Sequence, residues 1–358
     1  RLHLPRRAGG ARPPRMRLLD VRGQPMDEGL SAGLVEAMRR HLGAGGQVLL
    51  FLNRRGFAPA LLCHDCGWLA ECPRCDMPMT FHRAAGHLQC HHCDSRRPLP
   101  VQCPACGSPD LRAIGAGTER IEAVLRERFD GEQVLRIDRD TMRARGALEA
   151  GLARARSGEA KILLGTQMLA KGHHFPGVTL VGILDADQGL FSADFRAPER
   201  MAQTIVQVAG RAGRAERPGE VLIQTHHPEH PLLQQLVQGG YPAFAEAALV
   251  ERQAARLPPF SQLALLRAEA PRRADARAFL DAARASAEAL AAEGVQLWGP
   301  VPSPMERRAG RYRAQLLVQA PTRAQLHAFL SAWVEPLAAL KAARRARWSL
   351  EVDPGDTY

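Results

Sequence analysis

Short apolar runs alternate with stretches of helical periodicity over the first two thirds of the chain. Helices are predicted where apolar residues recur every three or four positions, and strands where short apolar runs stand between turn signals. Short apolar strands that alternate with helices favour a parallel sheet that is buried on both faces. We therefore predict one doubly wound α/β domain from residues 27–62 and 108–230. The predicted helices are 31–41, 118–129, 148–156 and 198–214, and the predicted strands are 47–52, 134–137, 162–164, 178–184 and 220–224.

The last hundred residues predict a second, smaller domain with a different order of elements. Strands are expected at 263–270, 295–298, 313–319 and 348–352, and helices at 275–292 and 323–343. This β-α-β-β-α-β order is typical of a split βαβ α+β domain, here residues 258–358. Pro258-Pro259 marks its start, because a double proline ends the preceding helix. Residues 231–257 are then a helical connector between the two domains.

Residues 1–26 carry arginines and prolines without apolar periodicity. They are predicted to be a linker from an N-terminal part that is missing here. The chain also opens on Arg1 rather than on Met, so we expect a piece of a longer protein.

Composition narrows the class of protein. Hydrophobic residues make up 46% and charged residues 24%, which is ordinary for a soluble globular chain and excludes a disordered tail, a collagen-like fibre and a disulfide miniprotein. No apolar run is long enough to span a membrane and no secretory leader is visible, so a cytoplasmic protein is expected. The formal net charge of +11 rests mainly on arginine. That bias suits phosphate-bearing partners, although a GC-rich codon supply explains it equally well.

All eight cysteines lie in one short stretch and form four C-x-x-C pairs. Disulfides would be spread over long loops, haem attachment needs a histidine after the second cysteine, and a redox motif normally occurs once. Two tetrahedral four-cysteine zinc sites account for all eight, with an iron–sulfur cluster as the alternative. Because such sites are closed, the zinc is predicted to be structural. The pairs are Cys63/Cys66, Cys72/Cys75, Cys90/Cys93 and Cys103/Cys106, and the predicted insert is 63–107.

Four pairs can be combined into two sites in three ways, and a nested combination fits the spacing best. The inner site would hold Cys72, Cys75, Cys90 and Cys93, closed by a loop of ordinary ribbon length, and the outer site Cys63, Cys66, Cys103 and Cys106. Glycines follow the outer pairs and aspartates the inner ones, and both residue types tolerate the left-handed backbone that often follows a knuckle. Pairing of neighbours is tight, and a crossed pairing stays open.

The segment Gln207–Arg214 is the sharpest short motif. If the predicted helix 198–214 continues through it, Gln207, Arg211 and Arg214 lie on one face, with Gly210 allowing close approach. Two arginines on one rigid face suit the charge that develops on a transferred phosphoryl group. The competing interpretation is an arginine-bearing helix face that is merely solvated.

Two further segments follow predicted strands. Gly165, Thr166, Gln167 and Lys171 lie in one loop that offers donors and a point charge to phosphate, although an ordinary connecting loop is an equal alternative. Asp185 and Asp187 come at the next strand end, where α/β proteins place functional residues, and a solvated strand end is the alternative there. The chain contains no G-x-x-x-x-G-K-[ST] loop, so it is not expected to hold ATP by itself.

Taken in order, these motifs resemble the second helicase lobe and the C-terminal domain of the primosomal protein N-prime family of bacterial replication-restart helicases. The resemblance covers residues 18–358. It is carried by 50–57, the four cysteine pairs, 165–175, 194–200, 207–214, Tyr241, Phe244 and 258–260.

The resemblance implies a RecA-like lobe of an ATP-dependent helicase that moves 3′ to 5′ on DNA, recognises stalled forks and loads the replicative helicase. It implies that Arg211 and Arg214, with Gly210 and Gln207 beside them, complete an ATP site across a lobe interface, and that Gly165, Thr166, Gln167 and Lys171 contact DNA. It implies two zinc ions in the nested arrangement. ATP and Mg²⁺ would be bound only together with the first lobe, which is absent here, so the chain alone is expected to be inactive.

The implied partners are forked and single-stranded DNA, primosome proteins and single-stranded-DNA-binding protein, in the nucleoid. The competing hypothesis is a non-catalytic module in which the zinc element and the C-terminal domain dock DNA or proteins.

Overall fold

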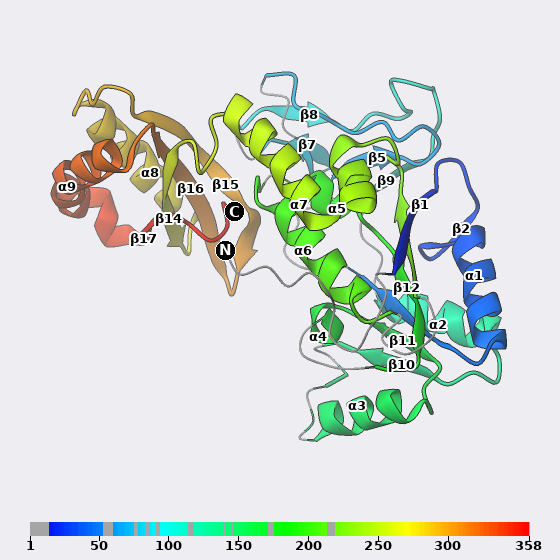
Figure 1. Ribbon diagram of the computed structural model, residues 1–358. Helices are drawn as coiled ribbons and strands as arrows, with labels where there is room; N and C mark the ends of the chain where they lie inside the picture. The colour runs from blue at the N-terminus through cyan, green and yellow to red at the C-terminus, as the bar shows by residue number, and fades with distance from the viewer. Residues whose placement is uncertain are drawn as a thin grey trace.

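The computed structural model describes most of the chain, and all statements below concern the described residues. They are 14–52, 60–74, 78–82, 86–90, 94–113, 118–138, 141, 142, 144, 146–170, 175–192, 194–212 and 219–357. They form a large α/β lobe, a small cysteine-bearing insert against one end of it, and a separate C-terminal domain beside it (Figure 1).

The lobe is built on a six-stranded parallel sheet in the order β1-β13-β12-β4-β11-β10. Every residue of β4 and β12 is buried, as a strand covered on both faces requires. The predicted parallel α/β sheet is therefore confirmed. The strands are β1 (Arg15–Asp20), β4 (Gln47–Phe51), β10 (Val134–Ile137), β11 (Ile162–Gly165), β12 (Val178–Ile183) and β13 (Glu220–Thr225).

Helices cover both faces of this sheet. Leu34 of α1 (Ala32–Gly43) and Ile121 of α2 (Thr118–Arg128) share one buried core with the strands. Leu152 of α3 (Ala147–Ser157) and Ile205 of α6 (Ala197–Ala209) share another core. Because these cores lie on opposite faces, the lobe is doubly wound, as predicted. Ser31 caps α1 by accepting a hydrogen bond from the backbone N–H of Leu34 at 3.3 Å.

The edge strand β1 corrects the prediction that residues 1–26 form a linker. Arg15–Asp20 pairs in parallel with β13, in register from Arg15 opposite Glu220 to Asp20 opposite Thr225. Met16 and Leu18 pack against the core. Alternating arginines mask the apolar positions of this strand in the sequence. Residues 1–13 lie outside the described residues.

The insert leaves the lobe after β4 and returns before α2. Its base is an antiparallel pair, β5 (Leu61–Cys63) with β9 (Leu111–Ala113). Beyond it lies a small three-stranded sheet of β6 (Thr80–His82), β7 (His87–Gln89) and β8 (Arg96–Pro98). In Figure 1 the insert lies above the lobe, next to α5 (Asp187–Leu190).

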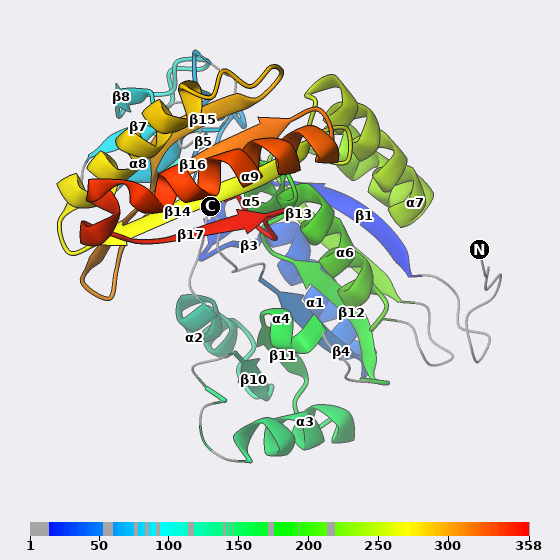
Figure 2. The same ribbon diagram turned by 90° about the vertical axis from the view of Figure 1, so that its left-hand side faces the viewer.

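The C-terminal domain has the predicted split βαβ arrangement, with antiparallel strands in the order β15-β16-β14-β17. Its core contains Phe279 of α8 and Trp333 of α9, and the indole N–H of Trp333 donates to Ser286 at 2.9 Å. Both helices lie on one face of the sheet (Figure 2). The elements are β14 (Gln262–Ala270), α8 (Arg273–Glu288), β15 (Gln296–Arg308), β16 (Arg311–Ala320), α9 (Arg323–Ala339) and β17 (Arg347–Val352).

The predicted connector is helix α7 (Pro231–Ala254), which kinks at Gly240. It packs along α6, where Arg252 pairs with Glu199 at 2.7 Å. Searched over the described residues, no helix has both the length and the apolar character to cross a bilayer.

Candidate functional site

Four cysteine sulfurs meet where the insert joins the lobe. The Sγ atoms of Cys63, Cys66, Cys103 and Cys106 all lie within 4.8 Å of one another. The Cys63–Cys106 and Cys66–Cys103 distances are both 3.7 Å. Sulfurs at about 2.3 Å from a tetrahedral zinc ion would be about 3.8 Å apart, so the four thiols have the spacing of a zinc site. This is the predicted outer site, and it excludes both the neighbour pairing and the crossed pairing.

The backbone around these cysteines has the turns of a zinc knuckle. Gly67 and Gly107 adopt φ values of +79° and +76°, as their left-handed tolerance predicted. Backbone N–H groups of Trp68 and Ala105 donate to the sulfurs of Cys66 and Cys103 at 3.4 Å. Burial raises the pKa of the Cys66 thiol to about 12, so a divalent cation would be needed to hold it as a thiolate. These residues fit zinc, which would act here as a structural cross-link.

The inner site is described in part. Cys72 and Cys90 are buried in one cluster with Met79 and Leu88, which is consistent with the nested pairing. Their partners Cys75 and Cys93 lie outside the described residues. Asp94, which follows the last of these pairs, has the predicted positive φ of 63°.

A partly buried chain of hydrogen bonds, called the relay below, connects the zinc knuckle to the lobe. Asp187 accepts from the backbone N–H of His226 at 2.9 Å and from its Nδ1 at 2.7 Å. The Nε2 of His226 lies 2.9 Å from Nδ1 of His64, and Nε2 of His64 lies 2.8 Å from the carbonyl oxygen of Gln24. Because His64 stands next to the ligand Cys63, the relay ties the metal site to the end of β13.

The two aspartates beyond β12 differ in their surroundings. Asp187 is 3% exposed and accepts from the Thr225 hydroxyl as well, so the solvated strand end considered above is wrong for it. Burial, and next the charge of Asp187, raise the pKa of Asp185 to about 7. Both aspartates line a cavity of about 160 Å³ at the carboxyl ends of the strands, together with His64 and His226.

The arginine motif corrects the sequence prediction in one respect. Helix α6 ends at Ala209, and the next residues tighten into a turn in which Arg211 N donates to Val208 O at 2.8 Å. The glycine that follows Ala209 explains the early end, since glycine is a poor helix former. Gln207 and Arg211 therefore do not share a helix face: Gln207 is exposed and Arg211 is 9% exposed. Arg214 lies outside the described residues.

The predicted loop after β11 begins with a close approach. A Cβ on Gly165 would lie 2.3 Å from the carbonyl oxygen of Ile137, so packing already requires glycine there. Thr166 follows, and Gln167 opens the short helix α4 (Gln167–Ala170). Leu169 of α4 and Ala212 belong to the same core, so this loop and the arginine motif are packed on common residues. Lys171 lies outside the described residues.

The structure adds a contact that sequence reasoning missed. The last residues of the chain lie along the start of α6, where Arg196 donates to the carbonyl oxygen of Pro354 at 2.8 Å and pairs with Asp353 at 2.8 Å. Arg200 donates to the carbonyl oxygen of Gly355 at 2.9 Å. We call residues 353–357 with Asp194, Arg196 and Arg200 the clasp; the C-terminus lies between the two domains in Figure 1. Two arginines at i and i+4 on a helix were the only signal in the sequence.

Three family models match the chain in sequence. Residues 72–98 match the PriA DNA helicase Cys-rich region domain, residues 114–216 the Helicase conserved C-terminal domain, and residues 253–355 the Primosomal protein N C-terminal domain. A parallel doubly wound sheet that carries a cysteine-rich insert and matches the helicase family model has the organisation of a helicase conserved C-terminal domain.

Two curated relatives identify the family to which the chain belongs. Replication restart protein PriA of Haemophilus influenzae is 47% identical over 355 residues, which are 99% of this chain and 48% of that protein. Replication restart protein PriA of Bacillus subtilis is 38% identical over 325 residues, 90% of this chain and 40% of that protein. The chain belongs to the PriA family, and it spans about half the length of the curated relatives it matches.

Among solved structures, S. cerevisiae Dbp5 bound to RNA and ADP BeF3 aligns with 67% of this chain and 44% of that chain. The identity is 13% and the TM-score 0.32.

Proposed function

We propose that the intact protein is an ATP-dependent DNA helicase that moves 3′ to 5′, recognises stalled or abandoned replication forks, remodels them and promotes primosome assembly. The observation that supports this best is the 47% identity to a replication restart protein PriA over 99% of the chain. The three family models support it as well, because they fall on the lobe, the insert and the C-terminal domain in the order expected.

In this proposal Arg211 and Arg214 complete a nucleotide site with Gly210 and Gln207 beside them. ATP and Mg²⁺ are held by a first lobe outside this chain, and the arginines stabilise the negative charge that develops on the transferred phosphoryl group. Arg211 is buried just beyond the C-terminal end of α6. This packing supports the role, because a buried side chain is held in one position. The 358-residue chain alone is proposed to be inactive as an ATPase.

Gly165, Thr166, Gln167 and Lys171 are proposed to contact the DNA backbone. Helix α4 and the turn that carries Arg211 pack in one core. This shared packing supports coupling between DNA binding and nucleotide binding, because a shift of one segment displaces the residues that contact the other.

Two zinc ions per chain are proposed, one on each nested set of four cysteines. They give the insert its shape, and the insert and the C-terminal domain contact forked or single-stranded DNA, primosome proteins and single-stranded-DNA-binding protein. The protein acts in the cytoplasm, at the nucleoid.

The test is DNA-stimulated ATP hydrolysis and unwinding of a forked duplex by the intact protein. Arg211→Lys and Arg214→Lys should each lower kcat about a hundredfold or more, because a lysine cannot reproduce the arginine fork. Arg156→Lys, on an exposed position of α3, is the control and should leave turnover unchanged. Unchanged turnover in both arginine variants would contradict the nucleotide role.

The second candidate is a non-catalytic docking module, which the closed cysteine site supports. An upstream reading frame that encodes a phosphate-binding loop favours the helicase, and a stop codon before Arg1 favours the module. Steady ATP turnover by the 358-residue chain, lost in Arg214→Ala, would overturn the proposal that the chain alone is inactive.

A further inference from the structure

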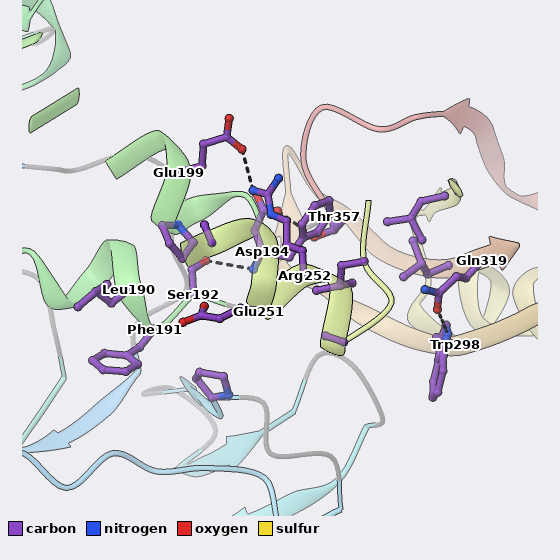
Figure 3. A pocket seen from close by; sticks show the side chains of 18 of the residues that line it. Leu190, Phe191, Ser192, Asp194, Glu199, Glu251, Arg252, Trp298, Gln319 and Thr357 are labelled. Carbon is purple, nitrogen blue, oxygen red and sulfur yellow. Dashed lines mark hydrogen bonds and ion pairs between the residues drawn. The ribbon is translucent and has the colours of Figure 1, made fainter. Parts of the chain in front are cut away.

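A cavity of about 400 Å³ lies where the lobe, the insert and the C-terminal domain meet (Figure 3). Its walls are largely apolar. Phe191 and Leu190 come from the lobe, Leu257 from the end of the connector, and Leu263 and Trp298 from the C-terminal sheet. Phe191 and Trp298 lie on opposite sides of the space in Figure 3. A cavity of this size holds one or two large side chains.

The charges around the cavity are acidic. Glu199 is neutralised by Arg252 at 2.7 Å, and Asp194 by Arg200. Glu71 and Glu251 line the cavity, are exposed, and have no ion pair among the described residues. Unpaired carboxylates on a chain of net charge +11 set this cavity apart from the rest of the basic surface.

We propose that this cavity is a docking site for a basic peptide segment of a partner protein, which inserts an aromatic or aliphatic side chain between flanking lysines or arginines. The apolar walls accept the inserted side chain, and Glu71 and Glu251 attract the flanking cations. A nucleotide base would fit the walls, but its phosphates would face the two carboxylates. An acidic peptide is disfavoured for the same reason.

The cavity also adjoins the contact between the C-terminal domain and α6. Thr357 lines the cavity, donates to Asp194 at 3.2 Å and accepts from Gln315, so an occupant rests against the clasp. Docking at this position would therefore bear on the contact between the C-terminal domain and α6. The proposal does not depend on the helicase assignment.

The test uses the intact, zinc-loaded protein and a fluorescein-labelled peptide of sequence Gly-Lys-Arg-Phe-Leu-Lys-Arg-Gly, followed by fluorescence anisotropy. Glu251→Lys should weaken binding about tenfold at low salt, because an attraction becomes a repulsion. Glu246→Lys, an exposed glutamate on the same helix that does not line the cavity, makes the same charge change and should weaken binding less than about twofold. Leu317→Trp fills the cavity from β16 and should abolish binding of the peptide.

Two competing probes complete the test: the peptide with glutamate in place of its basic residues, and a single-stranded oligo-dT. If the proposal is right, Leu317→Trp does not weaken the binding of either probe. It is overturned if the basic peptide fails to bind, if Glu246→Lys and Glu251→Lys weaken it equally, or if Leu317→Trp reduces binding of oligo-dT or of the acidic peptide instead.

Discussion

Arg196 stands at the start of α6, and its Nη1 donates to the carbonyl oxygen of Pro354, 158 residues further along the chain, at 2.8 Å. The same guanidinium pairs with Asp353 at 2.8 Å. The helix that is held at this end carries the turn with Arg211 at its other end. The C-terminal domain is thus attached to the element that positions the proposed nucleotide-sensing arginine.

Weakening the clasp should loosen the two domains without unfolding either. Arg196→Ala removes a hydrogen bond and a partly exposed ion pair, so the interdomain contact should lose about 1–2 kcal/mol. We expect faster proteolysis within residues 255–261 and faster amide exchange in residues 353–357. Arg345→Ala, on an exposed turn of the C-terminal domain, should change neither. Equal protection in both variants would mean that the clasp does not hold the domains together.

Loss of one knuckle ligand should remove one zinc ion. Cys66→Ser breaks a four-thiol site whose sulfurs lie within 4.8 Å, and serine is a much poorer zinc ligand than thiolate. Metal analysis after gel filtration should show about one equivalent less than in the unmodified protein. Asp65→Ala, an exposed residue between the same two cysteines, is the matched control and should keep its metal. An unchanged metal content in Cys66→Ser would contradict the outer site.

The relay should stabilise both the lobe and the metal site. Asp187→Ala leaves the Thr225 hydroxyl, the His226 backbone N–H and the His226 ring without their acceptor, so unfolding should become easier by about 3 kcal/mol. Zinc should also leave faster to a chelator. The exposed Asp130 has no ion pair among the described residues, and Asp130→Ala should shift stability by less than about 0.5 kcal/mol. Chelation at the unmodified rate in Asp187→Ala would show that the relay does not reach the knuckle.

Asp185 should make stability depend on pH. Its pKa is raised from 3.8 to about 7, so the native state binds a proton that the unfolded state has released between these values. The contribution of Asp185 to stability is therefore present below about pH 4 and is lost as pH rises to about 7. Asp185→Asn should remove this contribution. The difference in free energy of unfolding between the unmodified protein and the variant should therefore change between pH 4 and pH 7. If the free energies of unfolding of the two proteins change in parallel from pH 4 to pH 7, the raised pKa of Asp185 is contradicted.

Local patterns were enough to predict much of the fold. The apolar runs of β4 and β12 are strands because full burial leaves no polar alternation, and the glycines after Cys66 and Cys106 pointed to knuckle turns. The early end of α6 was missed because a glycine breaks a helix whose apolar periodicity continues.

Contacts between distant residues were beyond sequence reasoning. β1 is a strand because it pairs with β13 some 200 residues away, and its own residues give little sign of it. The His64–His226 contact joins two parts of the chain that only the fold brings together, 162 residues apart. The clasp has the same origin.

The edge position of β1 has a practical consequence for anyone who shortens this chain. A product that starts after Asp20 would uncover the hydrogen-bonding groups of β13, a strand with five of its six residues buried. Uncovered, apolar strand edges recruit other chains, so such a product is expected to precipitate on expression, whereas one that keeps Arg15–Asp20 is expected to remain monodisperse.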